Sequence, residues 1–168
     1  MSSELEMAES VAENLKSIMR QIPYPVTVIT AGTKKDKRGI TIGSFTSLSL
    51  EPPLVSFNVS KTSQMHELIA NTDHFVVHIP ESSQEKYCNR FAVPNLSTEE
   101  QFKGLDYTYN EHGIPVLKDL VAIITCKKYK FVEAGDHSIV IGEVTDINRN
   151  KEDAAILYLD GAYHAIRG

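Results

Sequence analysis

Hydrophobic positions follow a helical period at the start of the chain and a shorter one over most of the rest. In the first segment, apolar residues recur four, four, three and one positions apart and form one stripe of a helix, at Met7, Val11, Leu15, Ile18 and Met19. Two prolines at positions 23 and 25 end this pattern. We therefore expect an amphipathic helix over about residues 4–20, packed on the body of the protein or on a second subunit.

Beyond this helix the apolar segments are short, rich in β-branched and aromatic residues, and divided by turn-forming stretches. The segments that fit strands are VTVITA at 26–31, ITIGSFTSLSL at 40–50, PLVSFNVS at 53–60, HFVVHI at 74–79, LVAIITCKKYKFVEA at 120–134, HSIVIGEVTDINRN at 137–150, AILYL at 155–159 and AYHAI at 162–166. Gly135-Asp136 and Asp160-Gly161 are turn signals between the last four. This spacing indicates consecutive antiparallel hairpins.

Two interior segments have helical spacing, TSQMHELIAN at 62–71 and SSQEKYCNRFA at 82–92, and the stretch 94–115 has the composition of a loop-rich insertion. Crossover helices are too few to build parallel strand pairs. The sequence therefore predicts a single, mainly β domain over residues 1–168. Its architecture should be an antiparallel barrel with an N-terminal helix and two short interior helices.

Composition excludes several classes of function. The 168 residues include 17 Lys and Arg against 22 Asp and Glu, a net charge of −5, with no basic stripe to bind a nucleic acid backbone. No apolar run approaches the roughly 20 residues that cross a bilayer, and the N-terminus is acidic, unlike a secretory signal. We expect a cytoplasmic protein that binds neither nucleic acid nor membrane.

Motifs for metals and nucleotides are absent from the sequence. Cys88 and Cys126 lie far apart with no CxxC and are expected to be buried, reduced thiols. His66-Glu67 does not begin an HExxH motif, because Ala70 stands where the second histidine is needed. The chain also lacks GxxxxGK[ST] and GxGxxG. We expect no metal site, and any nucleotide cofactor must be bound without those folds.

Hydroxyl groups are densest around the middle of the 40–50 segment, at Thr41, Ser44, Thr46, Ser47 and Ser49. A half-buried strand needs one polar face, whereas these hydroxyls fall on both faces. One interpretation is a solvated edge strand with a bulge near Gly43. The other is the wall of a ligand site, where hydroxyls and free amides bind a polar heterocycle.

Two further groups of polar residues allow a structural and a functional interpretation. Ser60, Lys61 and Ser63 lie where a strand meets a helix, which suits either an ordinary N-cap or a phosphate site. Arg90 is either a second cation for that phosphate or a solvated side chain. A basic turn, either solvated or a clamp for the extra phosphate of NADPH, contains Lys34, Lys35, Lys37 and Arg38.

Four segments in order resemble the flavin reductase-like FMN-binding split-barrel family, which includes the reductase components of two-component flavin monooxygenases. They are PYPVTVIT at 23–30, GITIGSFTSLSLEPPLVSFNVSKTSQMHELI at 39–69, NRFA at 89–92 and GDHSIVIGEV at 135–144. The resemblance extends from about Ile22 to Ile166. It implies a homodimer of antiparallel Greek-key split β-barrels with FMN at the subunit boundary.

The resemblance also implies roles for individual residues. The isoalloxazine ring would be lined by Thr41, Ser44, Phe45, Thr46, Ser47, Leu48 and Ser49. The ribityl phosphate would be held by Ser60, Lys61 and Ser63, with Arg90 beside them. His137, in the Gly-Asp-His motif, would lie near the nicotinamide. The chain departs from the family at Gly43, where many relatives have Asn, and at Met65, where many have Thr.

The activity that the resemblance implies is NAD(P)H-dependent reduction of FMN, with FAD as the alternative flavin and NADH or NADPH as co-substrate. The reduced flavin would then reach a separate monooxygenase. Two other hypotheses stay open at this point. One is an FMN-binding electron-transfer or sensor protein without nicotinamide turnover. The other is an oxidase of the pyridoxamine phosphate type, disfavoured because Glu-Pro-Pro and Gly-Asp-His belong to the reductase pattern.

Overall fold

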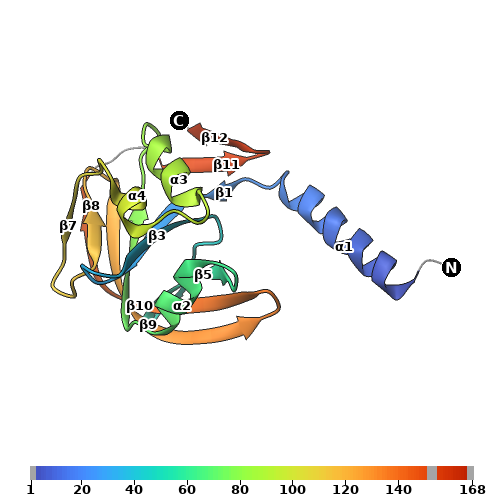
Figure 1. The fold of residues 1–168 in the computed structure, drawn as a ribbon, viewed down its shortest axis with the longest axis horizontal. Helices are drawn as coiled ribbons and strands as arrows, with labels where there is room; N and C mark the ends of the chain where they lie inside the picture. The colour runs from blue at the N-terminus through green and yellow to red at the C-terminus, as the bar shows by residue number, and fades with distance from the viewer. Residues whose placement is uncertain (1–2, 151–154, 166–168) are drawn as a thin grey trace.

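A seven-stranded antiparallel sheet forms the body of the protein in the computed structural model, which describes residues 3–150 and 155–165 (Figure 1). The strands are hydrogen-bonded in the order β3-β2-β6-β9-β10-β5-β4. Their bounds are β2 Thr27–Gly32, β3 Lys37–Ile42, β4 Thr46–Leu50, β5 Pro53–Ser60, β6 His74–Ile79, β9 Ala122–Ala134 and β10 His137–Arg149. β9 and β10 lie between β5 and β6, a crossover of the Greek-key kind. The predicted mainly β, antiparallel fold is confirmed.

Two smaller antiparallel sheets complete the fold. The first joins the two ends of the chain in the order β1-β11-β12 and the second pairs β7 with β8. Their bounds are β1 Tyr24–Pro25, β7 Tyr107–Tyr109, β8 Pro115–Leu117, β11 Ile156–Leu159 and β12 Ala162–Ala165. The predicted last strand is thus confirmed up to Ala165, and its final residue, Ile166, lies outside the described residues.

The interior contains one more helix than the sequence predicted. Besides α2 Gln64–Ala70 and α3 Glu85–Ala92, a helix α4 covers Thr98–Phe102. It lies in the stretch that was expected to be a loop-rich insertion, and β7 and the start of β8 lie there too. Ser97 caps α4 in a capping box with Glu100, and Phe102 is buried. The expectation of two interior helices is therefore wrong, since a helix of five residues is too short to show a helical period.

The first helix, α1 Glu4–Met19, begins in a capping box between Ser3 and Glu6, and its predicted extent is confirmed. It projects away from the sheets (Figure 1), and none of its residues is buried. Packing on the body of its own chain, one of the two expectations, is therefore wrong. Its exposed apolar residues are Leu5, Met7, Val11, Leu15, Ile18 and Met19. Within the described residues, no helix combines the length and apolarity that crossing a membrane requires.

The main core fills the space inside the large sheet and under α2. Phe57 and Phe75 meet there edge to face, with ring centroids 5.3 Å apart, and neither is exposed. On β5 the odd-numbered residues 55, 57 and 59 point into this core, so Ser56, Asn58 and Ser60 face outward. This alternation leaves a polar row on the outer face of β5.

Candidate functional site

The polar row of β5 orders several predicted site residues along one line. Thr46 of β4 is the register partner of Ser56, and the Ser44 hydroxyl accepts a 2.9 Å hydrogen bond from the Asn58 amide. At the far end, His137 of β10 is the register partner of Ser60. Residues directly opposite in a sheet point to the same face. The chain therefore brings the hydroxyl-rich segment and the Gly-Asp-His motif onto one surface, which we call the outer face.

The hydroxyls on both sides of the 40–50 segment have a local cause. The predicted single strand is two strands, broken at residues 43–45, and a register shift separates Ser47 from Ser49. Such a bulge rotates successive side chains out of strict alternation. Thr46, Ser47 and Leu48 are exposed, whereas Phe45 packs against the main core. Most of the predicted ligand-binding segment is thus exposed to solvent, and Phe45 attaches it to the main core.

A tight turn fixes the end of the outer face that carries His137. Gly135 has φ of +64° at this turn, and the Lys61 amide donates to the Asp136 carbonyl at 3.0 Å. The His137 Nδ1 lies 2.7 Å from an Asp136 carboxylate oxygen, and this hydrogen bond lowers the pKa of Asp136. Lys61 Nζ lies 3.7 Å from the Glu133 carboxylate. The imidazole is held at one nitrogen while its side chain stays 46% exposed.

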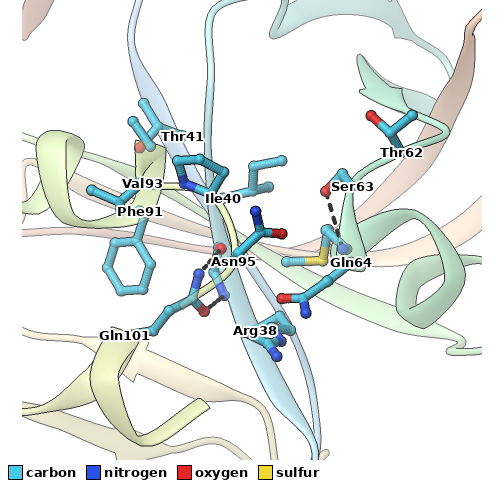
Figure 2. A pocket seen from close by; sticks show the side chains of 14 residues that line it. Arg38, Ile40, Thr41, Thr62, Ser63, Gln64, Phe91, Val93, Asn95 and Gln101 are labelled. Atoms are coloured by element: carbon cyan, nitrogen blue, oxygen red, sulfur yellow. Dashed lines mark hydrogen bonds between the residues drawn. The ribbon is translucent and has the colours of Figure 1, made fainter. Parts of the chain in front are cut away.

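A cleft of about 330 Å³ adjoins this region, between β3, the start of α2 and the end of α3 (Figure 2). Its lining includes the predicted residues Thr41 and Ser63, and also Arg38, Thr62, Gln64 and Asn95. Gln101 fixes the β3 side, because its amide group bonds both the N–H and the C=O of Gly39. The cleft is thus a polar hollow with a rigid wall.

Local hydrogen bonds hold the predicted cleft residues. Thr41 donates to the Cys88 carbonyl at 2.6 Å and so ties β3 to α3. Ser63 is the N-cap of α2 and accepts from the Met65 amide, and Met65 itself is buried in the core. Ser60 does not line the cleft, but its hydroxyl lies 3.0 Å from that of Thr62. Burial thus gives the apolar Met65 a packing role at that position.

Arg90 and Arg38 differ in their position relative to the cleft. The Arg90 guanidinium donates to the carbonyls of Glu100 and Lys103, at 3.0 and 2.9 Å, and does not line the cleft. Arg38 is the one cation among the described residues that line it, and its guanidinium also bonds the Leu96 carbonyl. In Figure 2, Arg38 and Gln64 lie together at one end of the cleft. Sequence reasoning placed Arg38 in a basic turn, because no local signal shows that its strand borders the cleft.

The donors at this site fit a flavin better than a metal ion. Hydroxyl and backbone groups suit the polar edge of a heterocycle, and a guanidinium with two hydroxyls suits a phosphate. Over residues 3–150 and 155–165, no three His, Cys, Asp or Glu side chains group as metal ligands. Cys88 and Cys126 are both free and buried, as expected, and burial raises the pKa of each thiol to about 12. Neither thiol is therefore a nucleophile at neutral pH.

Comparison with known proteins identifies relatives along nearly the whole chain. A family model described as "Flavin reductase like domain" matches residues 19–167. A "Flavin reductase" of Pseudomonas putida is 37% identical over 149 residues, which cover 88% of this chain and 86% of that protein. An "NADH:FMN oxidoreductase" of Rhodococcus erythropolis is 32% identical over 158 residues, 91% of this chain and 81% of that protein.

Two further matches name a reaction partner or a ligand. The "FADH(2)-dependent resorcinol hydroxylase, reductase component" of Rhizobium sp. is 30% identical over 159 residues, 94% of this chain and 88% of that protein. A solved structure, "Streptomyces globisporus C-1027 NADH:FAD oxidoreductase SgcE6 in complex with NAD and FAD fragments", superimposes with a TM-score of 0.85. It is 34% identical, and the match covers 93% of each chain.

Proposed function

The chain belongs to the flavin reductase-like family and is an NAD(P)H:flavin oxidoreductase, and we propose that its outer face and the adjoining cleft bind the flavin that it reduces. The observation that carries this placement is the register of β5. It aligns Ser44, Thr46 and His137 on one surface. The cleft that contains Thr41 and Ser63 adjoins the same segment.

Each part of a flavin has matching groups on this chain. We place the polar edge of the isoalloxazine ring against Thr46, Ser47, Leu48 and Ser49, whose strand is an edge strand with unpaired backbone groups. We place the ribityl phosphate with Ser63, Thr62 and Arg38, which line the cleft and offer an anion two hydroxyls and a guanidinium. Ser60 and Lys61 are outer contacts of the same phosphate, since Ser60 lies beside Thr62.

The chain's contribution to the reaction is orientation. A bound flavin supplies a ring that accepts hydride from the reduced nicotinamide. Asp136 holds His137 at Nδ1 and so fixes the direction of the imidazole. We propose that the free side of this ring positions the nicotinamide. Backbone amides of β4 stabilise the negative charge that develops on the polar edge of the flavin.

The helix α1 supports a homodimer. Its apolar stripe is exposed along its whole length, and none of the chain's described residues buries it. A second copy that covers this stripe would explain why an exposed helix carries so many apolar residues. Leu15→Glu should convert a dimer into a monomer in light scattering, whereas Lys16→Glu, beside it on the polar side, should not. A wild-type monomer at micromolar concentration would remove this part of the proposal.

The reduced flavin, on this proposal, passes to a separate monooxygenase. This rests on relatives that are named reductase components, among them the resorcinol hydroxylase reductase. The outer face supports it, because an open site lets reduced flavin leave. Reduced flavin made by this chain should sustain a flavin-dependent monooxygenase across a dialysis membrane. Transfer that needs direct contact between the two proteins would contradict release.

An anaerobic assay tests the reaction itself. Purified protein is mixed with excess FMN and with NADH or NADPH, and the flavin absorbance is followed. Bleaching of many equivalents per chain is the expected result, and FAD is measured in parallel. A protein that binds flavin but does not bleach it with either nucleotide would support the electron-transfer alternative and contradict the reductase activity.

A further inference from the structure

A cavity lined by three tyrosines lies beside the polar cleft, and none of the residues that carry the proposed function forms its aromatic wall. The cavity measures about 210 Å³ and is lined by Tyr24, Val26, Thr41, Gly43, Ala92, Tyr158 and Tyr163. Thr41 and Ala92 also line the polar cleft, so the two hollows adjoin. None of the described lining residues of this cavity carries a charge at neutral pH.

The three tyrosines form one packed group built from both ends of the chain. Tyr24 and Tyr158 are register partners in the small sheet, with ring centroids 5.4 Å apart, and Tyr158 lies 5.1 Å from Tyr163. Aromatic pairs in this arrangement stabilise one another. Burial raises the pKa of Tyr163 to about 12 and that of Tyr24 above its usual value, so both phenols stay neutral. The wall is therefore packed and uncharged.

Gly43 shows how closely Tyr24 approaches the predicted ring site. A Cβ atom on Gly43 would lie 2.3 Å from Cε2 and 2.5 Å from Cδ2 of Tyr24. The ring edge of Tyr24 thus fills the space that a side chain at position 43 would take. Residue 43 directly precedes Ser44, the first hydroxyl of the outer face. Tyr24 is consequently the aromatic side chain next to this segment, whereas Phe45 is turned into the core.

We propose that the tyrosine cavity binds the apolar dimethylbenzene edge of the flavin's isoalloxazine ring, with Tyr24 as the residue in contact. This inference rests on the proposed function. An isoalloxazine ring has a polar pyrimidine edge and an apolar benzenoid edge at its opposite end. The open hydroxyl segment suits the first and the uncharged aromatic cavity suits the second. Between them, the shared residue Thr41 borders the polar cleft that takes the ribityl chain.

Two ligands distinguish residues that contact the flavin ring from residues that contact the phosphate. Dissociation constants are measured by quenching of flavin fluorescence for FMN and for lumiflavin, which has the same ring but no ribityl phosphate. Tyr24→Ala should weaken both ligands by a similar factor of about ten, the loss of one aromatic contact. Arg38→Ala, the matched control, should weaken FMN and leave lumiflavin unchanged. Unchanged lumiflavin binding by a folded Tyr24→Ala protein would overturn the proposal.

An enlarged flavin tests the cavity without relying on a truncated protein. A flavin whose 8-methyl group is replaced by dimethylamino should bind wild type at least about tenfold more weakly than FMN, because added volume is costly against a packed wall. Tyr163→Ala should restore its affinity relative to FMN. Equal binding of the two flavins to wild type would show that the cavity does not hold this edge. A wild-type chain that binds neither flavin would instead overturn the proposed function itself.

Discussion

His78 of β6 and His137 of β10 have different surroundings. On β6, His78 is fully buried, and its Nε2 accepts the Leu117 amide at 3.1 Å. Its Nδ1 therefore carries the proton and donates to the Val28 carbonyl at 2.9 Å. Burial lowers the pKa of His78 to about 4. On β10, His137 is half exposed, and Asp136 holds its Nδ1 at 2.7 Å.

The difference extends to the regions around the two histidines. Beside His78, Thr30 is buried and donates to the Pro115 carbonyl at 2.6 Å, so its hydroxyl has a partner within the chain. On the outer face, Thr46 and Ser47 are exposed. A buried polar group needs a partner to offset its desolvation, whereas an exposed one is available to a ligand. The comparison separates polar residues that have partners within the chain, around His78, from exposed polar residues on the outer face, which we propose for flavin binding.

The largest expected effect is a loss of stability in the main core. Phe57→Ala removes a fully buried ring that packs on Phe75, which should cost about 3–5 kcal/mol. Leu50→Ala, on the open strand β4, removes a side chain that is 86% exposed and should change stability by less than about 0.5 kcal/mol. Urea unfolding measures both. Similar losses of stability for the two variants would contradict the distinction between the buried core and the exposed strand β4.

The buried histidine should make stability depend on pH. Below about pH 6.5 the unfolded chain protonates His78, while the folded chain keeps it neutral down to about pH 4. Stability should therefore fall as pH falls through this window, by about 3 kcal/mol for this group. His78→Gln should remove that part of the slope in denaturant titrations, and His137→Gln should keep it. A slope that survives His78→Gln would assign the effect to other groups.

The two arginines provide a matched pair on the question of ligand binding. Arg38→Ala should raise the flavin dissociation constant by a factor of about 10 to 100, the loss of a charge-assisted hydrogen bond. Arg90→Ala should leave that constant within about twofold and instead lower stability by about 1–2 kcal/mol, because it ties α3 to α4. Fluorescence quenching and urea unfolding measure the two quantities. Weaker flavin binding by Arg90→Ala, with unchanged binding by Arg38→Ala, would instead place Arg90 at the phosphate.

The smallest of these effects concerns the nicotinamide. His137→Ala should raise the KM for NADH or NADPH by about tenfold, a single lost contact, and change the flavin dissociation constant less. His66→Ala is the control, because His66 bonds Ser138 on the inner side of β10. Steady-state kinetics at saturating flavin give the KM. A larger effect on flavin than on nicotinamide would remove His137 from the proposed role.

Much of the fold could be predicted because the strands follow a simple period. PLVSFNVS and HFVVHI match β5 and β6 residue for residue. A bulge near Gly43 was one interpretation of its segment, but the full break of the strand at residues 43–45 was not predicted, since the local pattern does not show that the ring of Tyr24, nineteen positions away along the chain, lies against Gly43. Helix α4 was missed because five residues show no period, although the capping box at Ser97 was a usable signal.

Prediction of the site was limited by the same long-range packing. Hydroxyls and the Gly-Asp-His motif were visible as local clusters, and the register of β5 brings them together. Charge was harder to place, because a sequence does not show which arginine side chain borders the cleft. Arg90 donates to carbonyls in and directly after α4, whereas Arg38, which also bonds the Leu96 carbonyl, lines the cleft. Which of the two contacts phosphate stays a prediction.

Hydrogen exchange with and without flavin tests the central claim that the outer face and the adjoining cleft bind the flavin. Exchange of backbone amides is followed by mass spectrometry in the presence of saturating FMN, without nicotinamide. Protection from exchange should concentrate on residues 38–49 and 60–65, while the buried strands β2 and β6 should exchange equally slowly in both samples. Protection confined to other parts of the chain, with 38–49 and 60–65 unchanged, would contradict the account.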